Sequence, residues 1–148
     1  MGRIIVDTRM ATSVPGIWAA GDIVNFPLTT YGHKRVCITN WNIAMYLGKV
    51  AALNIMGQPY ETRTMPFYWT DHFGNSIWIA GHIDGFDDIV MTHQKEERKI
   101  CIFYCLEEVV LAVVTVNRDT VAASFATLRR LNKQLRKTDA LAWAEELK

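Results

Sequence analysis

Asp22 is the side chain in this sequence best placed to hold a small polar ligand. It ends residues 12–22, in which a Pro-Gly pair indicates a turn and residues 17–20 form a short apolar run typical of a strand. Ligands of open α/β sheets bind beyond the carboxyl ends of strands, where a carboxylate accepts hydrogen bonds from hydroxyl groups. Gly21 would let the backbone approach such a ligand closely. On spacing alone, a role of Asp22 in capping the following turn is favoured over a ligand contact.

A second candidate lies at the start of a predicted helix. Thr39 or Asn40 can cap this helix, while Gly57 and Pro59 end it. The apolar residues expected on its buried face are Trp41, Ala44, Gly48, Ala51, Ala52 and Ile55. The free backbone N–H groups of the first turn, Asn40 to Asn42, favour a negatively charged ligand.

The elements that position these residues change type along the chain. Residues 3–7 and 17–20 are predicted as short strands, and residues 25–38 as a loop before the helix. After a Pro-rich segment, the β-branched and aromatic runs joined by short turns predict an antiparallel sheet, with strands at 67–72, 76–82, 89–93, 99–106 and 109–116. Helices are predicted at 117–137 and 140–147, with Leu141, Ala144 and Leu147 inward in the last. The fold class is α+β.

The string T-x-x-P-x-I-W-A-x-G-D over residues 12–22 resembles the second flavin fingerprint of FAD-dependent pyridine-nucleotide oxidoreductases. The resemblance implies that Asp22, with Gly21 beside it, holds the ribityl chain of FAD. It also implies that the amides of Asn40 to Asn42 face the flavin carbonyl edge and that Trp41 lies beside the flavin and nicotinamide. A purely hydrophobic anchoring role for Trp41 is the alternative.

The second half of the chain also resembles this family. Residues 66–71, P-F-Y-W-T-D, are similar to the opening of the C-terminal reductase domain of ferredoxin reductases. With residues 84–88, D-G-F-D-D, and with Asn54 and Gly57, the chain looks closest to the Rieske-containing, AIF-like branch. Trp69 would then face the flavin, the alternative being a core aromatic. Thr39 replaces the acidic residue that ferredoxin reductases carry, so no catalytic residue is assigned.

The resemblance implies three parts, the end of an FAD-binding domain (1–57), a linker (58–66) and a C-terminal reductase-type domain (67–148). No G-x-G-x-x-G occurs in the chain, so the phosphate-binding loop is missing. The chain therefore looks truncated: the intact parent would use FAD and NAD(P)H, while this chain alone is expected to be inactive and to lack FAD. Electrons would pass to an iron–sulfur partner or domain. The family resemblance implies a mitochondrial or cytoplasmic location, and the chain shows no targeting signal.

Composition excludes several classes of protein. Half of the 148 residues are hydrophobic, which excludes a disordered chain, and the net charge of +1 argues against nucleic-acid binding. No apolar run is long enough to cross a bilayer, and the histidines show no metal-ligand spacing.

The cysteines and the basic residues give two further expectations. Cys101 and Cys105 lie about 13 Å apart along one predicted strand, too far for a disulfide, so both should be buried, reduced thiols. A basic stripe is expected on the helix at 117–137, either as a solvated face or as a docking patch for an acidic partner, formed by Arg129, Arg130, Lys133, Arg136 and Lys137.

Two further functions stay open beside the oxidoreductase. The chain could be a non-catalytic dimerisation or interaction module, and a homodimer is expected because residues 1–57 expose apolar side chains and unpaired strand edges. The exposed set includes Ile4, Ile5, Val6, Ile17, Trp18 and Trp41. Nucleic-acid binding through the basic helix is the weaker alternative.

Overall fold

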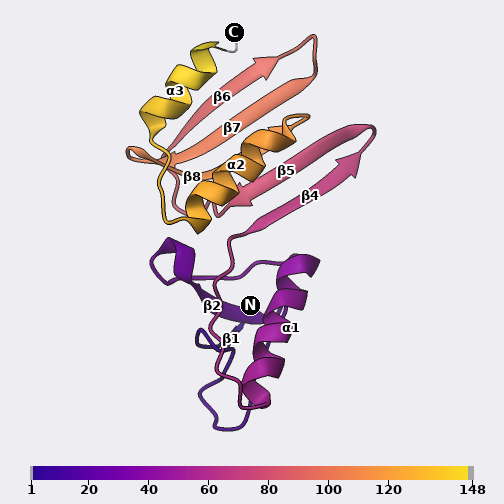
Figure 1. Ribbon diagram of the computed structural model, residues 1–148, viewed down its shortest axis with the longest axis vertical. Coiled ribbons are helices and arrows are strands. Elements are labelled where there is room, and N and C mark those ends of the chain that lie inside the picture. The colour runs from indigo at the N-terminus through magenta and orange to yellow at the C-terminus, as the bar shows by residue number, and fades with distance from the viewer. Residues whose placement is uncertain (1, 147–148) are drawn as a thin grey trace. The chain divides into compact units, whose positions relative to one another are not determined.

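The computed structural model describes residues 2–146, and the chain divides into two compact units, Met1–Thr64 and Met65–Lys148 (Figure 1). The first unit contains β1 (Ile4–Ile5), β2 (Val24–Leu28), the 3₁₀ turn η1 (Thr29–Tyr31), β3 (Lys34–Val36) and α1 (Trp41–Ile55). Its sheet has the order β1-β2-β3, in which β1 and β2 are parallel and β2 and β3 antiparallel.

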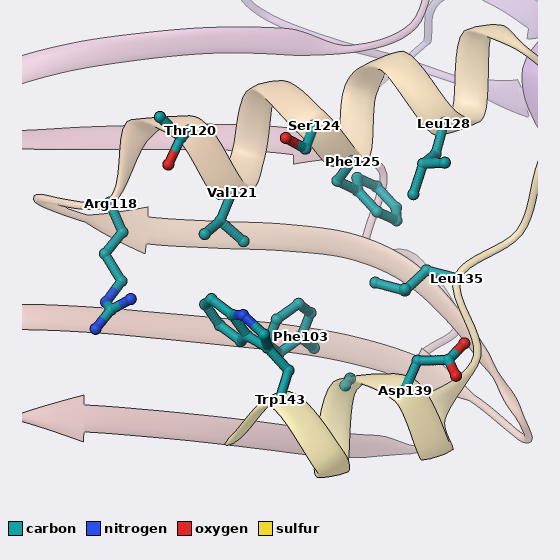
Figure 2. A pocket seen from close by; sticks show the side chains of 11 residues that line it. Phe103, Arg118, Thr120, Val121, Ser124, Phe125, Leu128, Leu135, Asp139 and Trp143 are labelled. Atoms are coloured by element: carbon teal, nitrogen blue, oxygen red, sulfur yellow. The ribbon is translucent and has the colours of Figure 1, made fainter. Parts of the chain in front are cut away.

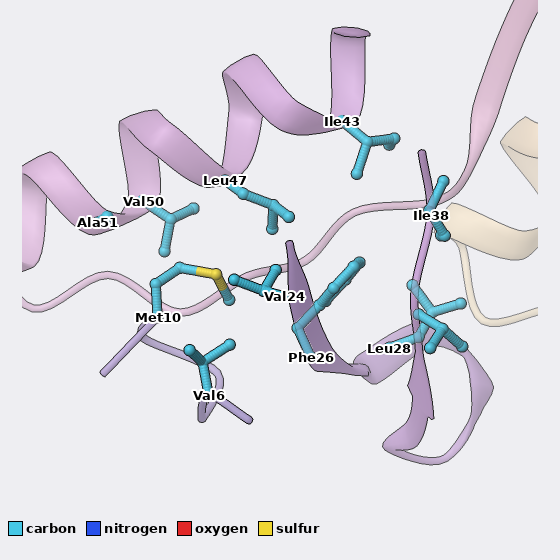
Figure 3. Close-up of a cluster of buried hydrophobic side chains, with 11 residues drawn as sticks. Val6, Met10, Val24, Phe26, Leu28, Ile38, Ile43, Leu47, Val50 and Ala51 are labelled. Atoms are coloured by element: carbon cyan, nitrogen blue, oxygen red, sulfur yellow. The ribbon is translucent and has the colours of Figure 1, made fainter. Parts of the chain in front are cut away.

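One face of α1 packs on this small sheet. Figure 3 shows the helix side chains pointing toward those of the strands and of the loop that carries Met10. The buried cluster comprises Val6, Met10, Val24, Phe26, Leu28, Val36, Ile38, Ile43, Leu47, Val50 and Ala51. The helix therefore contributes to the core of this unit through residues spaced three and four apart, and the strands and loops contribute the rest.

The predicted buried face of α1 is wrong in part, since Ala51 is buried as predicted. The buried residues Ile43, Leu47 and Val50 form a row beside the predicted one, whereas Trp41 and Ile55 are exposed. The helix carries apolar residues on both rows, and periodicity alone cannot choose between them. The predicted bounds are confirmed: Asn40 Oδ1 accepts the N–H groups of Asn42 and Ile43, and the helix ends in front of Gly57 at φ 72°.

Two predictions in the first 40 residues are also wrong. Residues 17–20 form no strand, because the turn at residues 13–16 folds them back and leaves one isolated bridge between Trp18 and Ala11. Part of the predicted loop at 25–38 is instead paired as β2 and β3. Pro27 lies beyond the residues of β2 that pair with β1, so its missing N–H is tolerated.

Asn54 fastens the end of α1 to the segment that follows it. Its Nδ2 donates to the carbonyls of Tyr60, Val50 and Arg9 at 2.7, 2.8 and 3.2 Å, and its Oδ1 accepts from the Tyr60 N–H at 3.1 Å. The Thr62 N–H donates to the Thr8 carbonyl at 2.7 Å. Residues 58–64, which the sequence indicates as a linker, are thus bonded to the first unit.

The second unit is a five-stranded antiparallel sheet with two helices, as the sequence predicts (Figure 1). The strands are β4 (Phe67–His72), β5 (Asn75–Gly81), β6 (Asp88–Gln94), β7 (Lys99–Leu106) and β8 (Val109–Val116), in the order β4-β5-β8-β7-β6. The hairpin of β7 and β8 has the predicted bounds. The α+β fold class is confirmed.

Gly81 of β5 lies against the backbone of β8. A Cβ atom at this position would lie 2.4 Å from the Leu111 carbonyl oxygen and 2.7 Å from the Ala112 Cα. The φ of Gly81 is 103°, in a region that side chains with a Cβ rarely adopt. Glycine is therefore required here for two independent reasons.

The two helices of this unit have other bounds than predicted. The first, α2 (Asp119–Arg130), is shorter than the predicted helix at 117–137, and the second, α3 (Lys137–Glu146), begins earlier than residue 140. Asn132 adopts φ 56°, and the N–H groups of Asn132 and Lys133 donate to the carbonyls of Arg129 and Leu128. This Schellman arrangement ends α2 early. Leu131 is consequently exposed, and the buried residues of α2 are Ala122, Phe125 and Ala126.

The inward face of α3 differs from the prediction in part. Ala140 and Ala144 are buried, as predicted for Ala144, whereas Leu141 is exposed. Leu147 lies outside the described residues. The Lys137 ammonium lies 2.6 Å from the Asp88 carboxylate and connects the start of α3 to β6.

Cys101 and Cys105 are buried free thiols, as predicted, and Cys37 is an exposed one. Within residues 2–146 no cluster of three or more candidate ligands could hold a metal ion. None of the described helices combines the length and the apolar character needed to span a membrane.

Candidate functional site

Gly21 and Asp22 occupy the turn that leads into β2, not the end of a strand as predicted. The backbone of Gly21 has φ 88°, and its carbonyl accepts the Val24 N–H at 3.3 Å. The Asp22 side chain is exposed, and within the described residues its carboxylate accepts no hydrogen bond. The capping alternative for Asp22 thus finds no bond to support it, and the carboxylate has its acceptor sites available.

This turn lies against the first turns of α1. A Cβ built on Gly21 would contact the Ala44 Cβ at 3.9 Å. Ala44 is one helical turn beyond Asn40, and its N–H donates to the Asn40 carbonyl at 2.8 Å. The fold therefore brings the turn at Gly21 and Asp22 close to the amino-terminal end of the helix, although some 20 residues separate this turn from the helix in sequence.

The amides of this helix end are only partly available. Asn40 Oδ1 takes the Asn42 N–H at 3.0 Å and the Ile43 N–H at 3.4 Å. Within the described residues the Trp41 N–H has no acceptor. Trp41 itself is 64% exposed, so its indole ring is free to contact a ligand and does not anchor the helix on the core of the unit.

Trp69 belongs to an aromatic cluster on β4 and β5. Its ring stacks on that of Trp78, with centroids 5.0 Å apart and planes at 18°. Phe67 lies 5.3 Å from Trp78, and the Arg130 guanidinium lies 6.0 Å from the Phe67 ring centroid. Trp69 remains 48% exposed, so the stack supports it on one side and leaves the indole open to a ligand.

Trp78 and Ser76 are members of this cluster that the sequence analysis did not single out. The Trp78 Nε1–H donates to Ser76 Oγ at 2.6 Å, which fixes the plane of the indole. Trp69 and Trp78 are Cα partners across the hairpin. The turn between the two strands is formed by Phe73 and Gly74, and counting outward from these two residues gives this pair.

The predicted site residues fall into two groups. Gly21, Asp22, Asn40, Trp41 and Asn42 lie in the first unit and share one region, as described above. Trp69 lies in the second unit.

The predicted basic stripe does not form one helix face. Arg129 and Arg130 are on α2, Lys133 and Arg136 are in the connection, and Lys137 begins α3. Arg130 lies over Phe67, and Lys137 is paired with Asp88. The early end of α2 at Arg130 breaks the helical spacing on which the stripe depended.

A strand order of β4-β5-β8-β7-β6 with two following helices defines the second unit, and a protein-family model described as "Reductase C-terminal" matches residues 67–147. The chain belongs to this family. The fingerprint at residues 12–22 lies outside the matched range. The family resemblance of the second half is thereby confirmed.

Curated relatives extend the match to both units. Apoptosis-inducing factor 3 of Mus musculus is 38% identical over 138 residues, covering 93% of this chain and 23% of the relative. The benzene 1,2-dioxygenase system ferredoxin–NAD(+) reductase subunit of Pseudomonas putida is 32% identical over 128 residues, covering 86% of this chain and 30% of the relative. The chain thus spans less than a third of the length of these relatives.

The fold is shared with solved structures. The covalent putidaredoxin reductase–putidaredoxin complex contains a chain that matches with a TM-score of 0.80 at 23% identity, over 97% of this chain and 36% of that one. At this level of identity the likeness shows the fold of the chain.

Proposed function

We propose that this chain forms one side of the FAD site and the reductase C-terminal domain of an FAD-dependent NAD(P)H oxidoreductase that delivers electrons to an iron–sulfur protein. The observation that carries the proposal is the placement of Gly21, in the fingerprint turn that also holds Asp22, beside Ala44 in the first turns of α1. The relatives named as ferredoxin–NAD(+) reductases support the reaction class. Bound FAD would supply acceptance of a hydride and release of single electrons.

The residues in hand fit one part of FAD. Asp22 offers an exposed carboxylate with free acceptor sites for ribityl hydroxyls, and Gly21 offers a backbone without a Cβ in the way. The Trp41 N–H, which has no acceptor within the described residues, and the Asn42 N–H, shared with the Asn40 cap, would face the flavin carbonyl edge. No G-x-G-x-x-G is present for the pyrophosphate.

Trp41 in the first unit and, separately, Trp69 in the second are each proposed to contact the flavin ring. Both indoles are exposed, and a large flat aromatic surface excludes water from a planar cofactor. Trp78 and Ser76 would hold Trp69 in a fixed plane through the stack and the 2.6 Å hydrogen bond.

A chimera tests this proposal. Residues 1–148 replace the matched segment of the Pseudomonas putida benzene dioxygenase reductase subunit, and FAD content is measured after extensive dialysis. We expect the chimera to retain FAD and Asp22→Ala to weaken its affinity about ten- to a hundredfold, because a hydrogen bond to a charged group is lost. Asp119→Ala, on α2, is the matched control and should keep FAD.

The second part of this test uses the isolated chain, outside the chimera. We expect the isolated 148 residues to purify colourless, because they lack the phosphate-binding loop. A chimera that folds but retains no FAD, or an Asp22→Ala variant that holds it as tightly as the parent chimera, would refute the proposed role of the fingerprint.

The finer assignments rest on the similarity to apoptosis-inducing factor 3. We place the intact protein in the Rieske-containing branch, with NAD(P)H as co-substrate, an acidic iron–sulfur partner or domain as acceptor, and a mitochondrial or cytoplasmic location. An apoptosis-related role belongs to this same set of proposals.

A non-catalytic dimerisation module is the second candidate function. It is favoured by exposed apolar side chains on α1, namely Trp41, Met45 and Ile55, and by the exposed Met56 at the C-cap of the helix. Ile4 and Ile5 of β1 are exposed as well. Apolar surface of this kind is uncommon on stable monomers and favours association with another copy.

A further inference from the structure

A groove of about 500 Å³ lies between α2 and α3 in the second unit. Figure 2 shows side chains of both helices and of β7 pointing toward the space between the helices. The apolar part of the lining is formed by Phe103, Val121, Phe125, Leu128, Leu135 and Trp143. A volume of this size, with mostly hydrophobic and aromatic walls, is typical of small-molecule sites.

The aromatic floor of the groove is well ordered by its own contacts. The rings of Phe103 and Trp143 meet edge to face, with centroids 5.6 Å apart and planes at 88°. Phe103 is a buried residue of β7, so it holds Trp143 of α3 over the sheet. A flat apolar body therefore finds a rigid surface in the groove.

One polar group at the end of the groove distinguishes it from a simple packing gap. Arg118 is half-buried, and within residues 2–146 no carboxylate pairs with it. Its guanidinium lies 5.5 Å from the Trp143 ring centroid, and its Nη2 donates to Gln94 Oε1. Its Nε is buried without an acceptor.

A cation removed from water without an anion is energetically unfavourable, and an anionic ligand would relieve this cost. The acidic residue of the lining, Asp139, forms no ion pair with Arg118 within the described residues, and its Oδ2 accepts the Arg136 N–H at 3.2 Å. The groove thus combines an apolar body with one positive charge that has no ion-pair partner among the described residues, and on which the Glu97 carboxylate acts only at longer range.

We propose that this groove binds a small, free aromatic or aliphatic carboxylate. The carboxylate would accept hydrogen bonds from the Arg118 guanidinium, and the apolar body would lie on Phe103 and Trp143. The proposal goes beyond the oxidoreductase function, because it uses none of the residues assigned to the flavin. A guanidinium binds a carboxylate through paired N–H groups, which makes the acid distinguishable from its neutral amide.

The probe pair is 2-naphthoate and its neutral analogue 2-naphthamide, titrated into the ¹⁵N-labelled full chain. The readout is the indole N–H signal of Trp143 in NMR spectra, assigned with Trp143→Phe. We expect 2-naphthoate to shift this signal saturably and 2-naphthamide to bind at least about tenfold more weakly, since a charge-assisted hydrogen bond is missing.

Two substitutions test the pose. Arg118→Gln should weaken 2-naphthoate binding about tenfold or more and leave 2-naphthamide binding unchanged. Ser124→Trp, at an exposed lining position, should fill the groove and abolish binding of both probes. The matched controls are Arg136→Gln and Ala123→Trp, which lie outside the lining and should bind as the parent chain does.

Several results would overturn the proposal. Equal affinities for the acid and the amide would show that Arg118 does not recognise the charge of the carboxylate. Shifts confined to signals away from α2 and α3, or no shift at millimolar probe, would show that the groove is not the site. A dimer that Ser124→Trp dissociates would show that a second copy of the chain occupies the groove instead. The acid–amide comparison uses the unsubstituted chain, so it tests the proposal even if a variant fails to fold.

Discussion

The thiol of Cys101 shows how strongly this sheet controls one side chain. Cys101 lies on the helix-covered face of β7 with no exposed surface, and burial raises the pKa of its thiol to about 12. The Arg118 cation acts in the opposite direction but is the smaller influence. A buried thiol in this state is neutral and chemically inert at ordinary pH.

This burial predicts how stability depends on pH. An unfolded thiol ionises at about 8.5, whereas the folded one keeps its proton, so the unfolded state gains from deprotonation first. The free energy of unfolding should therefore fall between about pH 9 and pH 11, by up to about 1.4 kcal/mol per unit from this group. Urea unfolding at several pH values measures the slope.

Cys101→Ala should lose that part of the slope, and Cys37→Ala, which removes an exposed thiol, should retain it. Equal slopes in Cys101→Ala and in the unsubstituted chain would show that another group causes the pH dependence. Burial raises the pKa of Cys105 in the same direction, so a smaller slope should remain in Cys101→Ala.

Gly81 gives a second prediction at this scale. Gly81→Ala places a Cβ 2.4 Å from a backbone oxygen and imposes a strained φ, so β5 and β8 must separate locally. We expect a loss of about 3 kcal/mol or more in the free energy of unfolding. Gly48→Ala on α1 is the control: its Cβ would meet nothing within 4 Å, and alanine is the better helix former. Similar urea midpoints for the two variants would contradict the prediction.

At the scale of elements, Asn54 connects α1, the loop around Arg9 and residues 58–64 with four hydrogen bonds. Asn54→Ala removes all four, so we expect a cost of about 2 kcal/mol and release of residues 58–64. Faster proteolytic cleavage and hydrogen exchange in this segment would be the signature. Gln58→Ala, an exposed neighbour, should leave both rates unchanged.

For some elements, local sequence signals are sufficient to predict the bounds. The bounds of β7 and β8 follow from two β-branched runs and a tight turn at Glu107 and Glu108, and α1 follows from Asn40 and Gly57. The early end of α2 could have been predicted from Asn132, a residue that tolerates positive φ, but the leucines at 131 and 135 continue the helical period and favour the wrong answer.

Non-local pairing explains what the sequence could not show. Residues 17–20 look like a strand, yet whether they pair depends on a partner elsewhere, and the structure gives them one bridge. The sequence does not predict β2, because Asn25 and Pro27 are unfavourable in strands. The structure accommodates both residues where β2 changes partner from β1 to β3. The Asp22 motif was found from its residues, whereas its turn setting was not.

At the scale of the whole molecule, the exposed apolar side chains on α1 predict a homodimer at micromolar concentration. Burying such side chains yields about 25 cal/mol per Å². Light scattering should give twice the chain mass, and Met45→Lys on α1 should restore the monomer by placing a charge in the contact. Met91→Lys on β6 replaces an equally exposed methionine, 61% against 64%, and should leave the dimer intact.

A monomer mass for the unsubstituted chain would contradict this prediction. A dimer that Met91→Lys dissociates while Met45→Lys does not would place the contact on the sheet of the second unit. Either result would remove the support that α1 gives to the dimerisation function.

The stacked indoles of Trp69 and Trp78 have an optical consequence. Two identical chromophores with centroids 5.0 Å apart and planes at 18° couple their excited states. Such a pair gives a split circular-dichroism signal of opposite-signed bands, which a lone tryptophan does not produce. The hairpin of β4 and β5 therefore carries a label-free spectroscopic reporter, whose amplitude should vanish in Trp78→Phe and fall whenever a ligand or a partner separates the two rings.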